Sequence, residues 1–290
     1  MDKVVVIGGS GFVGSHAADA LSERGYQVTI YDCKTSPWLR EDQKMVLGDV
    51  LDIDKLYKTI DGARYVYHYA GIADISESML KPYETININV MGASAVVQAA
   101  VKARVERFIY ASTMYVYSPY GSFYRASKQA TETIIEAYHE QYGIDYTFLR
   151  YGSLYGPRAQ EWNGLYGYVN QIISDRKLNY RGSGNEKREY IHVRDAAALS
   201  VKILDDKHKN QAITVTGQQI LNSSELIDMI FEITGIRKNV EYHDEDADSG
   251  HYKLTPYRYT PKQAKKLVPE EFIDIGQGIL EVVEDISHKS

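Results

Sequence analysis

The sequence has almost no cysteine, no long apolar run and no excess of positive charge. Cys33 is the only cysteine among 290 residues, which excludes an internal disulfide and a thiolate metal cage. No run of about 18 apolar residues occurs, so we expect no membrane span. The N-terminal text MDKVVVIGGSG lacks the layout of a signal peptide. These absences together predict a cytoplasmic protein without a membrane partner.

The charge balance argues against nucleic acid as a partner. Lys and Arg total 33 against 39 Asp and Glu, giving a net charge of −6, whereas proteins that bind phosphate backbones carry basic patches. A small anionic ligand stays compatible, because it needs only a local positive site. The acidic segment 243–251 has metal-ligand residue types without a recognised metal spacing, so we predict no metal site.

Apolar β-rich runs alternate with helical patterns over the first half of the chain. The expected strands are 3–7, 27–31, 44–47, 64–69, 107–111 and 145–149, and the expected helices are 12–24, 53–60, 82–103 and 124–142. This alternation is typical of a parallel sheet with helices on both faces. Right-handed crossovers make such an α/β fold a doubly wound Rossmann sheet, whose ligands bind at the carboxyl ends of the strands.

The pattern loosens after residue 149. Segments rich in Gly, Pro and Tyr (YGSLYGPR, GLYGYV and RGSGNEKREY) suggest loops and short elements around a substrate. A last helix is expected to start near Asn222–Glu225, with Asn222 as its cap and Gly235 at its end. We assign residues 1–150 to a dinucleotide-binding domain that also receives segments from about 188–222. Residues 151–290 form mainly a smaller C-terminal substrate-binding domain.

A glycine-rich turn joins the first expected strand to the first expected helix. Gly8, Gly11 and Gly14 have the spacing G-x-x-G-x-x-G. Glycine permits the tight turn and lets backbone N–H groups approach a pyrophosphate, which the helix N-terminus also attracts. A tight turn without a ligand is the alternative, but the place between strand and helix near the N-terminus favours a dinucleotide.

Acidic residues follow the next two strands. Asp32 ends the second strand, 24 residues after Gly8, where a carboxylate accepts hydrogen bonds from a ribose 2′-OH and repels a 2′-phosphate. The cofactor predicted from this position is NAD rather than NADP. Asp49, followed by Val50, ends the next strand and is expected near the adenine ring. A plain turn aspartate is the alternative at both positions.

A tyrosine and a lysine stand at the start of the helical segment 124–142. Tyr124 and Lys128 are four residues apart and share one helix face. The strand before them ends in Ser112 and Thr113, and a strand-end hydroxyl followed by this pair suits carbonyl and carbinol chemistry. Since the chain has 25 tyrosines, the spacing alone proves nothing, and the argument depends on the position of the pair.

These features occur in the order of a known family. The chain also has HYAG at 68–71, NV at 89–90, STMYVY at 112–117, LR at 149–150 and REYIHVRD at 188–195. The set resembles the extended short-chain dehydrogenase/reductase family, in its NAD-dependent epimerase/dehydratase branch, over most of the chain. Within that branch it is similar to the UDP-galactose (UDP-glucose) 4-epimerases.

The resemblance implies a role for each matching residue. Tyr124 is the expected acid/base, Lys128 binds the nicotinamide ribose and lowers the pKa of that tyrosine, and Thr113 hydrogen-bonds the reacting sugar oxygen. Arginines suit the diphosphate. The expected cofactor contacts are Gly8, Gly11, Phe12, Val13, Gly14, Asp32, Asp49, Val50, Ala70, Gly71, Asn89, Tyr124 and Lys128. The expected substrate contacts are Ser76, Thr113, Tyr124, Ser153, Arg188 and Arg258.

The chain departs from the family pattern in places that bear on the substrate. The loop from Tyr117 to Tyr124 is short, Ser153 replaces an expected asparagine, and Ala73 stands where the galactose epimerases have lysine. In related dehydratases the two residues after the strand-end threonine are acids, whereas Met114 and Tyr115 stand here. These departures separate the general chemistry, which the motifs indicate, from the identity of the sugar.

The resulting hypothesis is an NAD-dependent nucleotide-sugar epimerase. It would invert C4 of a UDP- or other NDP-hexose through a transient keto-sugar, with the cofactor carrying the hydride. The resemblance also implies a homodimer, formed by the helical segment 82–103 and the helix that bears Tyr124. The alternatives are an NAD(P)H-dependent 4-keto-sugar nucleotide reductase and, from another class, a non-catalytic dinucleotide-binding regulator.

Overall fold

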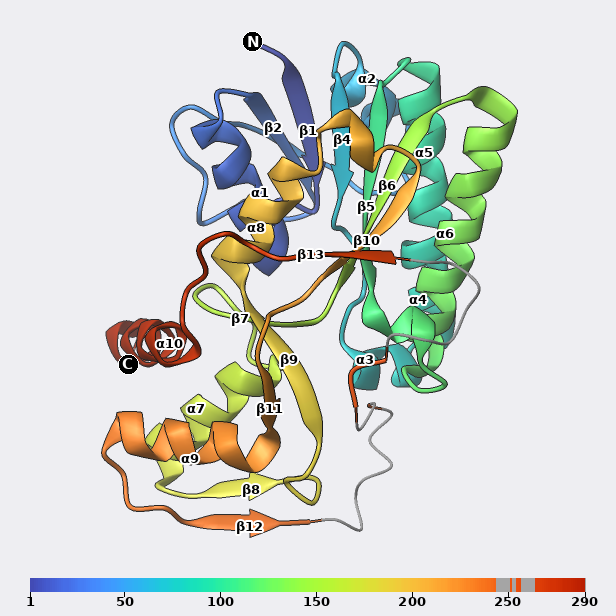
Figure 1. The fold of residues 1–290 in the computed structure, drawn as a ribbon. Coiled ribbons are helices and arrows are strands. Elements are labelled where there is room, and N and C mark those ends of the chain that lie inside the picture. The colour runs from blue at the N-terminus through green and yellow to red at the C-terminus, as the bar shows by residue number, and fades with distance from the viewer. Residues whose placement is uncertain (244–250, 252–253, 257–263, 290) are drawn as a thin grey trace.

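The computed structural model describes residues 1–243, 251, 254–256 and 264–289, and its largest element is an eight-stranded parallel sheet (Figure 1). The strand order β13-β10-β6-β5-β4-β1-β2-β3 contains the 3-2-1-4-5-6 order of a Rossmann fold, so the predicted fold class is confirmed. The strands are β1 (Lys3–Ile7), β2 (Gln27–Asp32), β3 (Lys44–Leu47), β4 (Tyr65–His68), β5 (Arg107–Thr113), β6 (Asp145–Tyr151), β10 (Gln211–Val215) and β13 (Ala264–Leu267).

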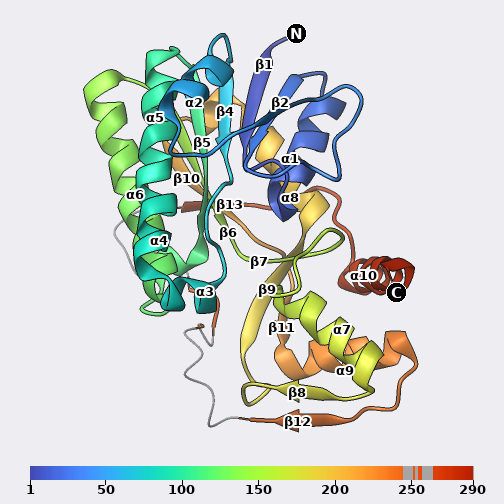
Figure 2. The same cartoon turned by 180° about the vertical axis from the view of Figure 1, so that it is seen from behind.

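Helices cover both faces of this sheet (Figures 1 and 2). On one face lie α1 (Phe12–Glu23) and α8 (Val193–Lys202); on the other lie α2 (Ile53–Ile60), α5 (Ala93–Lys102) and α6 (Ser122–Tyr142). Strand β1 shows why: Val4 and Val6 pack in the core beneath α1 and α8, whereas Val5 and Ile7 pack beneath α2 and α5. Successive residues of a strand point to opposite faces of the sheet. A strand that is apolar at every position therefore needs helices packed on both faces.

The helical segment 82–103 is one run with a widened middle. It consists of α4 (Pro82–Ile86), a π-helical segment (Asn87–Gly92) and α5. A Cβ on Gly92 would lie 2.7 Å from Val50 Cγ2, so the close packing of this turn on the 48–51 loop requires glycine. The expected helix is therefore present, with a local change of pitch, and π-helical turns of this kind occur frequently at functional sites.

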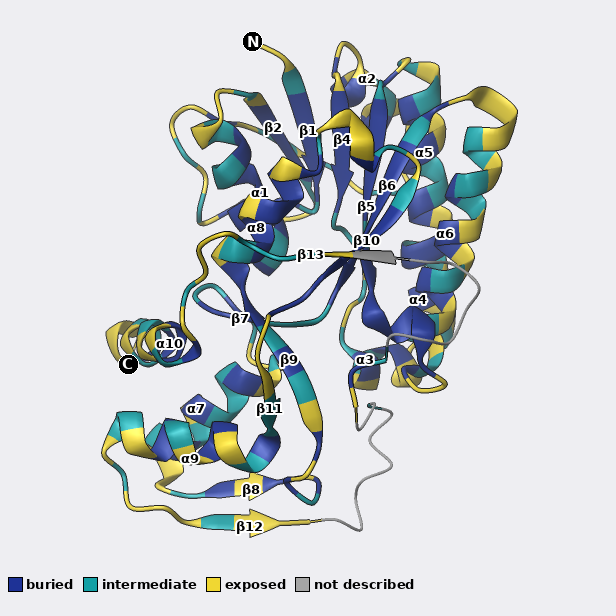
Figure 3. Cartoon of the chain, in the orientation of Figure 1, coloured by how far each residue is buried: buried dark blue, intermediate teal, exposed yellow. Residues whose placement is uncertain are grey.

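A smaller lobe follows below the carboxyl ends of the strands (Figure 1). Its own core contains Leu165, Ile172, Leu226, Ile230 and Ile279, and Figure 3 shows buried faces of its helices turned inward. The lobe has a three-stranded sheet, β11-β9-β7, and a two-stranded sheet, β12-β8. Its elements are β7 (Ser153–Tyr155), α7 (Gly164–Asp175), β8 (Leu178–Tyr180), β9 (Lys187–His192), β11 (Ile220–Asn222), α9 (Ser223–Thr234), β12 (Val240–Tyr242) and α10 (Ile275–Lys289).

The chain passes between the two lobes more than once. Strands β10 and β13 belong to the large sheet, although each follows a stretch that builds the smaller lobe. The large sheet therefore includes residues from beyond position 222 as well as from the first 150. The assignment of one lobe to the cofactor and the other to the substrate stays a prediction.

Two expectations for the C-terminal half are wrong. GLYGYV begins the twelve-residue helix α7 instead of a loop, because the Asn163 side chain caps that helix by accepting from the backbone N–H of Tyr166 at 3.2 Å. Helix α9 starts and ends as expected, between Asn222 and Gly235. It is not the last helix, because α10 follows it and packs into the core of the smaller lobe.

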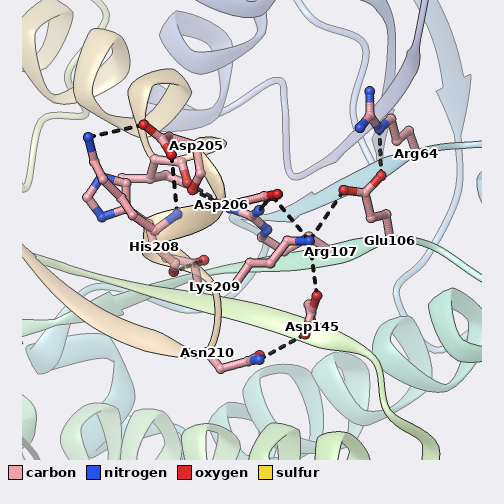
Figure 4. A network of polar contacts seen from close by, with 12 residues as sticks. Arg64, Glu106, Arg107, Asp145, Asp205, Asp206, His208, Lys209 and Asn210 are labelled. Carbon is pink, nitrogen blue, oxygen red and sulfur yellow. Dashed lines mark hydrogen bonds and ion pairs between the residues drawn. The ribbon is translucent and has the colours of Figure 1, made fainter.

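A polar network closes the end of the large sheet opposite the smaller lobe (Figure 4). Arg107, fully buried at the start of β5, donates to the carbonyl of Ile203 at 2.8 Å and pairs with Asp206 at 3.0 Å. Lys209 lies 3.1 Å from Asp206 and 3.4 Å from Asp145. The network joins the start of β5 and β6 to the α8–β10 connection. These polar contacts lie at the amino ends of the strands, away from the carboxyl ends where ligands bind in such sheets.

Candidate active site

A cavity of about 1480 Å³ lies where the carboxyl ends of the strands meet the smaller lobe. It is lined by the β1–α1 turn, by the ends of β2, β4 and β5, and by residues of α6, β7 and β9. The expected site residues that line it are Gly8, Gly11, Phe12, Val13, Gly14, Asp32, Asp49, Val50, Ala70, Gly71, Ser76, Thr113, Tyr124, Lys128, Ser153 and Arg188. One continuous space thus brings the expected cofactor and substrate residues together, and their individual roles stay predictions.

The glycine-rich turn is shaped by two close contacts. Gly8 has φ +82°, and a Cβ there would lie 2.3 Å from the backbone nitrogen of Ala70. A Cβ on Gly14 would lie 2.2 Å from the carbonyl oxygen of Gly8, whereas one on Gly11 would meet nothing closer than 3.5 Å. The first turn of α1 contains no acidic residue. The turn therefore offers an open backbone and an unopposed positive helix end, which fits a pyrophosphate.

Asp32 is fixed at the end of β2 by backbone donors. One carboxylate oxygen accepts from the N–H of Ser10 at 2.9 Å and the other from the N–H of Lys34 at 3.1 Å. The next strand end is tied to the same place, because the Tyr31 hydroxyl donates to the carbonyl of Asp49 at 2.8 Å. These bonds set the carboxylate on the cavity wall beside the glycine turn, where ribose hydroxyls fit as further donors.

The strand β5 is two residues longer than predicted, and this places Thr113 at its end. The Thr113 hydroxyl oxygen accepts from the backbone N–H of Tyr115 at 3.2 Å. Lys128 reaches back from α6, and its Nζ donates to the carbonyl of Ala111 at 2.8 Å. The same Nζ lies 5.9 Å from the centre of the Tyr124 ring. Thr113, Tyr124 and Lys128 therefore share one wall of the cavity.

The environment of Lys128 is unusual for a lysine. Its side chain is buried, and Nζ lies 4.7 Å from the centre of the Tyr110 ring. Burial lowers the pKa of Lys128 to about 8, and the charge of Glu132 acts in the opposite direction. The structure thus places a buried amino group beside the ring of Tyr124.

A buried ion pair stands directly behind these residues. Arg150 Nη2 lies 2.6 Å from one oxygen of Glu132, and Arg150 Nε donates to the other at 3.0 Å. The Ser112 hydroxyl donates to Glu132 at 2.6 Å, and Tyr117 accepts from Arg150. The pair links β5, β6 and α6. Sequence reasoning missed Glu132; its only local signal is its place four residues after Lys128, on the same helix face.

Asn89 does not line the cavity, although a cofactor contact was expected there. Its amide is buried and accepts from the N–H of Ile72 at 2.7 Å, while donating to the Ile72 carbonyl at 2.9 Å and to the Ser127 hydroxyl at 3.0 Å. Gly71, at φ +153°, approaches so closely that a Cβ would lie 2.7 Å from Asn89 Oδ1. Asn89 thus holds the 70–72 loop against α6.

The expected substrate residues come from both lobes. Ser76 lies in the first turn of α3 (Ile75–Leu80), which Asp74 caps, and Ser153 and Arg188 come from β7 and β9. Arg258 lies outside the described residues. Sequence reasoning missed Glu186, which accepts from the Tyr180 hydroxyl at 2.9 Å and orders the tight turn between them; its partners come from a loop without a motif.

The described part of the chain has neither a membrane-spanning helix nor a metal-binding cluster. None of its helices is long and apolar enough to cross a membrane. Its histidines, cysteines and acids form no group of three or more that would hold a metal ion.

Comparison with known proteins gives consistent matches. The sequence profile of the NAD dependent epimerase/dehydratase family matches residues 4–216. A putative UDP-glucose 4-epimerase of Methanocaldococcus jannaschii is 27% identical over 97% of each chain. A UDP-N-acetyl-α-D-glucosaminuronate decarboxylase of Bacillus cytotoxicus is 27% identical over 80% of each. The structure of a UDP-glucuronic acid 4-epimerase from Bacillus cereus, solved with UDP-glucuronic acid and NAD, has a TM-score of 0.87 at 23% identity and covers 99% of this chain and 100% of that one; this likeness concerns the fold.

Proposed function

The chain belongs to the NAD-dependent epimerase/dehydratase family, and on that premise we propose that it is an NAD-dependent nucleotide-sugar epimerase. The most specific form of the proposal is inversion at C4 of a UDP- or other NDP-hexose. The observation that carries it is the shared cavity wall of Thr113, Tyr124 and Lys128, next to a glycine turn that fits a pyrophosphate. The curated relatives include a decarboxylase and dehydratases as well as epimerases, so the reaction itself needs a test.

NAD fits the cavity residue by residue. The turn from Gly8 to Gly14 would hold its pyrophosphate, Asp32 its adenosine ribose, and Lys128 the nicotinamide ribose. Bound NAD supplies a hydride acceptor that later returns the hydride, so the sugar passes through a keto form. A non-catalytic regulator needs only the glycine turn, and the three polar side chains at the other end of the cavity argue against that alternative.

The chain's own residues handle the proton and the orientation of the sugar. The Thr113 hydroxyl would hydrogen-bond the reacting sugar oxygen, and Tyr124 would remove its proton and give it back. Lys128 would stabilise the phenolate form that Tyr124 has before it takes the proton and again after it has returned it. Arg188 would bind the diphosphate, because guanidinium groups suit bidentate contacts with phosphate oxygens.

The direct test is a screen of nucleotide sugars by NMR with the purified protein. We expect reversible conversion of one sugar nucleotide into its epimer without added cofactor and without a net change in free NADH. Steady consumption of NADH with a keto-sugar substrate would favour the reductase instead. Loss of CO₂ from a uronic acid nucleotide would place the chain with its decarboxylase relatives.

Cofactor choice gives a first prediction. Native protein stripped of nucleotide should bind NAD at least tenfold more tightly than NADP in a calorimetric titration, because the Asp32 carboxylate repels a 2′-phosphate. In Asp32→Asn the preference should narrow, while Asp42→Asn, an exposed carboxylate outside the cavity, should leave it unchanged. Equal affinities of the native protein for NAD and NADP would show that Asp32 does not select between them.

Elimination of water is a second discriminating measurement. Met114 cannot transfer a proton, and a phenol such as that of Tyr115 is by nature a much weaker acid than the carboxyl groups that stand at these positions in the related dehydratases. We expect no product about 18 mass units lighter when nucleotide hexoses are incubated with the protein and analysed by mass spectrometry. Appearance of that product would identify a dehydratase.

Dimer formation is a third prediction. Exposed apolar side chains lie on both sides of the junction between α3 and α4: Leu80 at the end of α3 is 84% exposed and Tyr83 in α4 is 85% exposed. Covering them with a second copy would bury apolar area that single chains seldom leave in contact with water. Light scattering should give twice 32.9 kDa, and Tyr83→Glu should shift the mass toward one chain. A native protein that scatters as a single chain at micromolar concentration would contradict the dimer.

A further inference from the structure

A tyrosine and a histidine far apart in sequence meet on the wall of the cavity. The Tyr115 hydroxyl and His251 Nδ1 are hydrogen-bonded at 2.5 Å, and the two rings meet edge to face with centroids 6.0 Å apart. Both side chains line the cavity. Tyr115 follows the end of β5, whereas His251 comes from the stretch after β12. This contact brings a residue of the C-terminal part of the chain to the reacting end of the site.

The pair lies beside the proposed acid/base. The Tyr115 ring meets the Tyr124 ring edge to face with centroids 6.0 Å apart, and its backbone N–H donates to the Thr113 hydroxyl. Ile75 packs on the same ring. A Cβ on Gly121 would lie 2.7 Å from Tyr115 Cδ1, so the short loop before α6 needs glycine there to admit the ring. The position of Tyr115 is therefore fixed from three sides.

The histidine of this pair is neutral near pH 7. Burial, with a further contribution from the charge of Arg188, lowers the pKa of His251 to about 4, and Asp74 acts in the opposite direction. A neutral imidazole has one donor and one acceptor nitrogen. Whichever ring nitrogen carries the proton, the bond between the two side chains uses one donor and one acceptor. The ring nitrogen of His251 that does not contact Tyr115 is then a donor or an acceptor on a side chain that lines the cavity, and a hydroxyl group can pair with either.

We propose that Tyr115 and His251 bind the sugar substituent on the carbon next to the reacting one, and that this substituent is a hydroxyl group. The inference rests on the proposed function. Thr113 and Tyr124 face the reacting oxygen, so the ring that adjoins Tyr124 faces a neighbouring position. For reaction at C4 these neighbours are the 3-hydroxyl and the hydroxymethyl group on C5. We assign the pair to the hydroxymethyl group, because its oxygen stands one bond further from the sugar ring than the 3-hydroxyl does and the Tyr115 ring centre lies 6.0 Å from that of Tyr124.

The test compares a hexose with a pentose that lacks the hydroxymethyl group. UDP-glucose and UDP-xylose are titrated calorimetrically into NAD-loaded protein, and kcat/KM for inversion is measured for each. We expect Tyr115→Phe, which keeps the ring on Tyr124, to weaken binding and kcat/KM for UDP-glucose about 3- to 10-fold. The loss for UDP-xylose should stay below twofold. His251→Ala should give the same pattern, and the double variant should lose little more than either single one.

The matched control is Tyr120→Phe. Tyr120 is exposed and lies outside the cavity wall in the same short segment, so removing its hydroxyl should change neither affinity nor kcat/KM. Equal losses for the two sugars in Tyr115→Phe would mean that Tyr115 only positions Tyr124, and would overturn the proposal. Unchanged affinity for UDP-glucose, or native protein that binds the two sugars alike or binds neither, would overturn it as well. The protein could also bind UDP-glucose more tightly than UDP-xylose, lose that difference in Tyr115→Phe, and yet invert no nucleotide sugar. That result would support this inference and contradict the proposed function.

Discussion

Tyr124→Phe should lower turnover roughly 10²- to 10⁴-fold while leaving NAD bound. The substitution removes one hydroxyl from the cavity wall and keeps the ring that meets Tyr115. Without that hydroxyl no side chain takes the proton from the sugar oxygen held by Thr113, so hydride removal lacks its partner step. The glycine turn and Asp32 are untouched, and affinity for NAD should stay within about threefold, well under the 1.4 kcal/mol of a tenfold change.

The measurement is initial-rate inversion of the sugar nucleotide identified by NMR, with NAD content determined after release. Tyr142→Phe is the matched control, because Tyr142 ends the same helix and is exposed to solvent. Its turnover should equal that of the native protein. Turnover of folded, NAD-loaded Tyr124→Phe within tenfold of native would mean that another group carries the proton, and the mechanism given to this site would have to be abandoned.

Glu132→Gln should cost about 3–5 kcal/mol of unfolding free energy. Glu132 is 2% exposed and Arg150 is 1% exposed, so removing the carboxylate charge leaves a guanidinium buried without its counter-ion. The Ser112 hydroxyl loses a charged acceptor at the same time. A loss of this size should lower the melting temperature by on the order of 10 °C. Urea denaturation followed by circular dichroism gives the free energy.

The design of this experiment includes a matched surface variant and a double variant. Glu140→Gln changes an exposed carboxylate on the same helix and should alter stability by less than about 0.5 kcal/mol. Replacing both partners, as Glu132→Leu with Arg150→Met, should destabilise less than Glu132→Gln alone, because no buried charge is then left unpaired. If the unfolding free energy of Glu132→Gln lies within about 1 kcal/mol of the native value, the charge of Glu132 contributes little to stability, and the prediction is wrong.

The features that sequence reasoning predicted well depend on local pattern. The strand at 3–7 is apolar on both faces, the turn at 8–14 needs glycine at its close contacts, and the helix at 53–60 has one apolar face with Asp52 at its start. Periodicity and spacing determine such elements without knowledge of distant partners. The cavity also contains most of the expected site residues, since in a parallel sheet all strand ends reach the same edge.

The features that were missed depend on contacts between distant segments. Glu132 becomes a buried charge only because Arg150 on β6 comes to lie against α6. His251 reaches Tyr115 across 136 residues of sequence. For Asn89 a cofactor contact was predicted, with a buried turn-forming side chain as the alternative, and the structure shows its amide bonded to the 70–72 loop. In each case the residue type was visible, but its partner was set by tertiary packing, which no local pattern encodes.

The repeated passage of the chain between the two lobes has a consequence for its biosynthesis. Strand β6 pairs with β10, and β10 with β13. One side of the sheet is therefore completed by a strand translated after part of the smaller lobe, β10, and by one translated after most of it, β13. A nascent chain of about 150 residues would leave the hydrogen-bonding edge of β6 bare, and bare edges invite self-association. Pairing over such long sequence separations is also slow. A chain that ends near residue 200 would therefore lack β10 and β13 and would expose the edge of β6.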